Sequence, residues 1–74
     1  MYTRIKEIRE DRDILQQDIA KLLKTTPQQY GRYENGHREL PIYHLKTLAE
    51  YYNISADYIL GIIDDPKPIK EIKK

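Results

Sequence analysis

The sequence predicts an all-α fold built from five short helices. Apolar residues recur at spacings of three and four, helix start and stop signals divide the chain at short intervals, and no stretch alternates as a strand would. Seventy-four residues suit one small domain, which buries about 60% of its unfolded surface. We expect this domain over residues 1–63. A short flexible C-terminal tail, 64–74, should follow, because Pro66 and Pro68 cannot continue a helix.

The first two helices are predicted to be amphipathic. Ile5 and Ile8 lie three residues apart on the first, which should start with Thr3 as its N-cap and reach about Asp13. The second should run from about Gln16 to Leu23. Its buried side is supplied by Ile19, Ala20, Leu22 and Leu23.

The third helix has the clearest boundaries in the chain. Thr26 is a suitable N-cap and Pro27 a favourable first helical residue. Gln29 completes a capping box with Thr26, and Asn35-Gly36 can make the left-handed turn that ends a helix. About eight residues are too few for a helix that is stable alone, so the rest of the domain must support it.

The two sides of this helix differ in chemistry. At about 100° per residue, Tyr30 and Tyr33 fall on one side. Gln28, Arg32 and Asn35 fall roughly opposite. Arginine pairs with guanine and glutamine with adenine in the major groove, so this face can read base edges. A merely solvated polar face is the alternative, and this helix alone does not decide between them.

Two further helices are predicted after the third. Pro41 should open the fourth, and Asn53 should end it in a left-handed conformation. Its apolar stripe comprises Ile42, Leu45, Leu48, Ala49 and Tyr52. Ser55 should cap the fifth helix and Gly61 should end it. That helix contributes Tyr58, Ile59 and Ile62.

The composition excludes several kinds of protein. There is no cysteine, hence no disulfide, thiol nucleophile or thiolate metal site, and a reducing, cytoplasmic location is the natural interpretation. No apolar run approaches the length of a membrane span. The net charge of +1 argues against purely electrostatic binding of nucleic acid, but not against specific binding through a local patch.

No catalytic or metal-binding constellation can be assembled from the sequence. It lacks a nucleophile–base pair, a carboxylate dyad in a pocket and a glycine-rich phosphate loop, so we predict neither an enzyme nor a cofactor. His37 and His44 have no evident further ligands for a metal.

Two segments stand at a distance typical of one family, Gln16-Gln17-Asp18-Ile19-Ala20 and Arg32-Tyr33-Glu34-Asn35-Gly36. They are accompanied by Ile5-x-x-Ile8-Arg9, Leu45-x-x-Leu48-Ala49 and Asn53-Ile54-Ser55-x-x-Tyr58-Ile59-Leu60-Gly61. Together they resemble the Cro/C1-type (Xre-family) helix-turn-helix DNA-binding domain of phage and bacterial repressors, over about residues 3 to 61. The resemblance implies a compact lambda-repressor-like fold in which the helix from Pro27 lies in the major groove.

The resemblance also assigns roles to individual residues. Gln28 and Arg32 match base-reading positions, and Gln29 is a weaker match because the capping box engages its side chain. Arg9 and Glu34 match a buried structural ion pair. The positions that match phosphate-binding residues are Gln16, Thr26, Asn35, His37 and Arg38.

Two positions depart from the family pattern. Leu15 stands where a capping Ser or Thr is usual, so the second helix should begin more loosely. Lys24 replaces the small turn residue between the two motif helices, and it needs either an ordinary right-handed backbone or a strained one.

The function implied is that of a repressor which binds a palindromic operator in double-stranded DNA as a homodimer. We expect the dimer surface to be built from Tyr58 to Ile63. The alternative is a protein-interaction module, such as an antitoxin that grips a toxin partner, with DNA binding secondary. A polar outward face on the third helix favours DNA, whereas an apolar face there would favour a protein.

Overall fold

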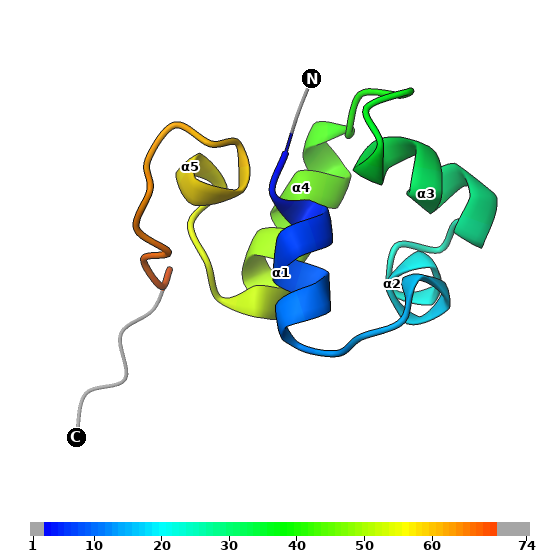
Figure 1. Ribbon diagram of the computed structural model, residues 1–74, viewed down its shortest axis with the longest axis horizontal. Helices are drawn as coiled ribbons and strands as arrows, with labels where there is room; N and C mark the ends of the chain where they lie inside the picture. The colour runs from blue at the N-terminus through cyan, green and yellow to red at the C-terminus, as the bar shows by residue number, and fades with distance from the viewer. Residues whose placement is uncertain (1–2, 70–74) are drawn as a thin grey trace.

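The computed structural model describes residues 3–69, and this part of the chain contains helices and no strand (Figure 1). The helices are α1 (Ile5–Asp11), α2 (Gln16–Leu22), α3 (Pro27–Glu34), α4 (Ile42–Tyr52) and α5 (Ala56–Ile59). The predicted all-α fold is therefore confirmed. Among the described residues, no helix has both the length and the apolar character that crossing a membrane requires.

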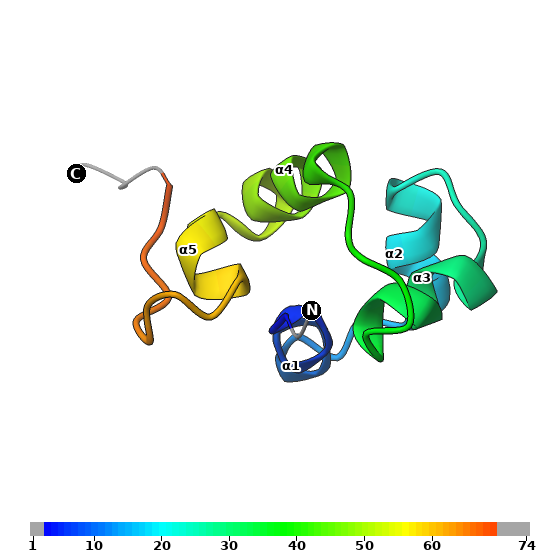
Figure 2. The same cartoon turned by 90° about the horizontal axis from the view of Figure 1, so that it is seen from above.

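The five helices are arranged with the motif pair at one end of the molecule. In both views α2 and α3 lie together, α5 and the chain after it lie at the opposite end, and α1 and α4 run between them (Figures 1 and 2). The helices α2 and α3 pack on each other, as do α4 and α5. This arrangement leaves one side of α3 free of other helices.

All five helices contribute to one apolar core. Its buried members are Ile5, Ile8, Ile19, Ala20, Leu23, Tyr30, Tyr33, Leu48, Ala49, Tyr52, Ile54 and Ile59. Tyr30 is 0% exposed, and a tyrosine this deeply buried contributes a large apolar area to the core. The eight-residue helix α3 is thus held by its aromatic side, as its pattern predicts.

Local sequence signals predicted several helix ends correctly. The Thr26 hydroxyl accepts the backbone N–H of Gln29 at 3.1 Å, with Pro27 as the first helical residue. The Ser55 hydroxyl caps α5 in the same way, and Asn53 ends α4 with a φ of 53°. Each signal acts within a few residues of its own position, so these ends can be found from sequence.

The start of α1 was predicted wrongly. Its N-cap is Arg4 rather than Thr3, and no side chain caps it. The Arg4 amide donates to the carbonyl of Ile59 at 2.9 Å, which ties the chain entering α1 to α5. Thr3 is consequently buried against the fold instead of capping a helix.

Two apolar residues expected in the fourth and fifth helices are exposed. Ile42 is 81% exposed, because Pro41 is the N-cap of α4 and the first turn of the helix projects past the core. Ile62 is 69% exposed, because α5 is a single turn and Gly61, with a φ of 79°, redirects the chain.

The departures noted at Leu15 and Lys24 have structural consequences. Leu15 occupies the N-cap position of α2 without a side-chain cap and is largely exposed. Lys24 has a φ of 57°, so the connection between α2 and α3 contains a left-handed lysine. A side chain with a Cβ is strained in this conformation by roughly 1–2 kcal/mol.

The chain after α5 folds back on the domain. The Arg4 guanidinium donates to the Asp64 carboxylate at 3.0 Å, and the Ser55 amide donates to the Lys67 carbonyl at 2.8 Å. The domain boundary at residue 63 stays a prediction. Residues 70–74 of the expected tail lie outside the described residues.

We expect Lys24→Gly to stabilise the domain. It removes the left-handed strain, and the greater entropy of glycine in the unfolded chain offsets part of the gain, leaving about 0.5–1 kcal/mol. The free energy of unfolding in urea, followed by circular dichroism, measures this. Lys21→Gly makes the same exchange inside α2 and should destabilise by about 1 kcal/mol. Equal destabilisation by the two variants would contradict the account.

Candidate nucleic-acid interface

An open hollow is formed where α1, α2 and α3 meet. Its lining residues are Lys6, Gln16, Pro27, Gln28, Gly31, Arg32, Glu34 and Asn35. Four of the residues predicted to contact DNA lie in this lining, namely Gln16, Gln28, Arg32 and Asn35. They come from α2, from α3 and from the residue that caps the end of α3, but they line one hollow.

The helix α3 presents its polar side to this hollow. Tyr30 and Tyr33 are 0% and 7% exposed, whereas Gln28, Arg32 and Asn35 are all exposed. The contrast follows from the 100° turn per residue, which places the two tyrosines opposite the polar group. On the outer face, an arginine can donate two hydrogen bonds to guanine O6 and N7, and a glutamine can donate to adenine N7 while its oxygen accepts from the N6 amino group.

Gln29 has a different environment from the other two base-reading candidates. It is half-buried, and its side-chain amide donates to the Tyr33 hydroxyl at 3.4 Å. Thr26 acts as the cap, as predicted, but within residues 3–69 the Gln29 side chain is bonded to Tyr33 and not to the Thr26 amide. Gln29 does not line the hollow.

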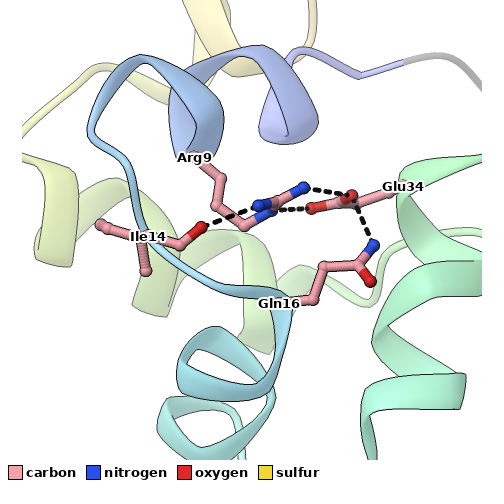
Figure 3. A network of polar contacts seen from close by, with 4 residues as sticks. All are labelled: Arg9, Ile14, Gln16 and Glu34. Atoms are coloured by element: carbon pink, nitrogen blue, oxygen red, sulfur yellow. Dashed lines mark hydrogen bonds and ion pairs between the residues drawn. The ribbon is translucent and has the colours of Figure 1, made fainter.

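A network of polar contacts joins the three helices (Figure 3). Arg9 of α1 donates from Nε to Glu34 Oε2 at 2.7 Å and from Nη2 to Oε1 at 3.2 Å. Its Nη1 donates to the carbonyl of Ile14 at 2.7 Å. The Arg9 and Glu34 side chains are 12% and 3% exposed, so this two-bond ion pair is largely removed from water.

The electrostatics of the network favour the charged forms of both partners. Burial alone would raise the pKa of Glu34, but hydrogen bonds, from Arg9 above all and also from Gln16, outweigh burial and lower it. The hydrogen bond to Glu34 raises the pKa of Arg9 further. Burial, and then the neighbouring Glu34 carboxylate, raise the pKa of Tyr30. The Tyr30 hydroxyl is buried and has no partner in hydrogen-bond geometry among the described residues.

Gln16 belongs to both the network and the hollow. It is the first residue of α2, and its Nε2 donates to Glu34 Oε1 at 2.9 Å. The sequence pattern assigned Gln16 only to a phosphate and gave no indication of this bond. Because Glu34 is also bound to Arg9, the position of the Gln16 side chain is tied to the packing of α1 against α3.

The remaining phosphate candidates are exposed but lie outside the hollow. Thr26, His37 and Arg38 are exposed and do not line it. The turn that carries the last two is ordered by the Arg38 amide, which donates to the Arg32 carbonyl at 3.2 Å, and by Gly36 with a φ of 76°.

One lining residue was missed by the sequence analysis. Lys6 is exposed on α1 and faces the same hollow as the polar residues of α2 and α3. It stands in a charged stretch of the first helix, and only the packing of α1 against α3 distinguishes it from its neighbours there.

The histidines form no metal site in this part of the molecule. No group of three or more His, Cys, Asp or Glu suited to a metal occurs within residues 3–69. His44 instead packs edge-on against Tyr33 and Tyr43, with ring centroids 5.8 and 4.5 Å away. Burial lowers the pKa of His44, which favours the neutral ring.

The lowered pKa of Glu34 predicts how acid affects stability. A carboxylate with a depressed pKa in the folded state contributes stability above its ordinary value of 4.5 and loses that contribution as the pH falls through the folded value. We expect Glu34→Gln to cost about 3 kcal/mol at pH 7, because Arg9 loses its partner. We also expect the stability of the Glu34→Gln variant to depend less on pH below 5 than that of the wild type.

Urea denaturation between pH 7 and pH 3 measures both effects. Glu50→Gln, at an exposed position on α4, serves as the matched control and should follow the wild-type curve. Parallel curves for wild type and Glu34→Gln would contradict the assignment of the buried charge.

Comparisons with known proteins place the chain in a family. A family model described as helix-turn-helix matches residues 5–59, from the start of α1 to the end of α5. The chain is 34% identical over 70 residues to YobD of Bacillus subtilis (strain 168), described as an uncharacterized HTH-type transcriptional regulator. The match covers 95% of this chain and 62% of YobD, so the chain spans about three-fifths of that relative's length. No solved structure matches the chain significantly.

The matched region includes the helix pair α2–α3, the buried network and the hollow. The predicted resemblance is thereby confirmed. The protein belongs to the Cro/C1-type helix-turn-helix family.

Proposed function

We propose that this protein binds a palindromic operator in double-stranded DNA as a homodimer and represses transcription there. It would act in the cytoplasm, by occluding RNA polymerase. The observation that supports this proposal is the outer face of α3, where Gln28 and Arg32 are exposed opposite two buried tyrosines. A helix held in this way can enter the major groove and place both side chains on base edges.

The residues around this face fit the phosphate backbone that borders the groove. Gln16 and Asn35 line the hollow beside Gln28 and Arg32, and each offers a side-chain amide. Contacts of this kind fix the register of a protein on the duplex without reading its sequence. Thr26, His37 and Arg38 are exposed near the two ends of α3 and would extend the contact along the backbone.

The chemistry of the hollow also favours DNA over a protein partner such as a toxin. The exposed large apolar residues of the described chain are Leu15, Ile42, Tyr43, Tyr51, Ile62 and Ile69. None of them lines the hollow. A protein-binding site would concentrate such residues at its centre, whereas this one is lined mainly by polar side chains.

The proposed dimer surface depends mainly on one residue of the segment from Tyr58 to Ile63. Ile59 is fully buried in the core, and Tyr58 packs partly against it. Ile62 is 69% exposed and belongs to no helix. It is therefore the apolar side chain of this segment that is most available to a second copy.

Selection of bound sequences from a random duplex pool tests the proposal. It should return a palindrome with half-sites about 10 base pairs apart, one helical turn. Recovery of sequences with no shared element would contradict specific binding.

Arg32→Ala should weaken binding to the selected operator by roughly 1–3 kcal/mol and relax the preference at one base pair, most simply a guanine. Asn35→Ala should weaken binding to all sequences alike, because it removes a backbone contact. Titrations against the operator and its single-base variants measure both effects. Unchanged affinity and preference in Arg32→Ala would refute the assignment of base reading.

Ile62→Asp should convert the dimer to a monomer at micromolar concentration, because it places a charge in the proposed apolar interface. Sedimentation velocity measures the change. Ile42→Asp, which alters an even more exposed isoleucine on α4, is the matched control and should remain dimeric. A wild-type protein that is monomeric both free and on DNA would disprove the interface.

A further inference from the structure

We infer that Lys6 binds a DNA phosphate, so that α1 joins α2 and α3 in contacting the duplex. The inference rests on the proposed function and extends it to a third helix. Its basis is position, since Lys6 is exposed in the first turn of α1 and lines the hollow together with Gln16, Gln28, Arg32 and Asn35.

The charges around the hollow are unevenly balanced. Lys6 and Arg32 are the cations in the lining, and Glu34 is the carboxylate. That carboxylate is already bound by Arg9 at 2.7 Å, from outside the lining. The two exposed cations therefore leave the hollow positive, although the chain as a whole carries only +1. A local excess of this kind attracts a phosphate backbone.

The two basic residues on this side of α1 have different environments. Arg9 lies three residues after Lys6, on a neighbouring part of the helix surface. Arg9 is turned inward, with its guanidinium bound to Glu34 and to the Ile14 carbonyl. Lys6 is exposed and forms no ion pair within residues 3–69. Arg9 holds the helices together, and Lys6 is left available for a ligand.

The chemistry of lysine indicates a phosphate rather than a base. Its ammonium is a compact charge with three donors on a flexible stem, which suits a phosphate oxygen at the rim of a groove. Base reading uses planar, bidentate groups, which here lie on α3. Lys6 would thus hold the duplex in register while α3 reads it.

The test is the salt dependence of binding to the selected operator, compared between Lys6→Gln and Lys46→Gln. Lys46 is an exposed lysine on α4 that does not line the hollow, so the two variants change the net charge equally. A plot of log K against log salt has a negative slope, and each lost phosphate contact reduces its magnitude by about 0.9. We expect this reduction per half-site for Lys6→Gln and no reduction for Lys46→Gln.

Base preference should be unchanged in Lys6→Gln, and Lys6→Arg should restore the slope. Melting curves of each variant verify that the fold is intact. If the wild type binds specifically and Lys6→Gln and Lys46→Gln have equal slopes, the proposed role of Lys6 is refuted and the proposed function is not. A wild-type protein that selects no sequence would instead refute the proposed function.

Discussion

The structure depends on the buried contact between Arg9 and Glu34. The arginine comes from α1 and the glutamate from the last residue of α3, and two hydrogen bonds join them away from water. Gln16 adds a third bond from the start of α2. A charge buried without its partner is costly, so α3 cannot leave this position without a large loss of stability. The network thus fixes the orientation of a helix that would not be stable alone.

The exposed polar surface of α3 follows from that orientation. With Tyr30 and Tyr33 in the core and Glu34 in the network, the outer side of α3 is left to Gln28, Arg32 and Asn35. Their exposure is a consequence of how the opposite side is held. Gln16 connects the buried network to the exposed surface, because it is bound to Glu34 and also lines the hollow that we propose for the DNA backbone.

Much of the fold could be predicted because its signals act over a few residues. The Thr26 and Ser55 caps and the left-handed Asn53 were found correctly for this reason. The wrong N-cap at Thr3 and the exposure of Ile42 and Ile62 have another origin. Whether these residues are buried depends on where distant parts of the chain lie, such as the Ile59 carbonyl that binds the amide next to Thr3.

The same distinction applies to the candidate site. The periodicity of α3 predicted the exposed face that carries Gln28 and Arg32. The bond from Gln16 to Glu34 and the place of Lys6 in the hollow require the packing of α1 and α2 against α3, which no local pattern encodes. Lys24 lies between these cases, because its position in a tight turn was evident but its strained backbone was one of two possibilities.

We propose that the buried network turns the polar face of α3 outward to meet DNA. Titration of nitrogen-labelled protein with its selected operator, followed by amide and side-chain NMR resonances, measures this orientation. The largest shifts should fall on Gln28, Arg32 and Asn35, and the Arg9 guanidinium signal should stay close to its free position. Shifts centred on the first turn of α4, or disruption of the Arg9 signal on binding, would contradict it.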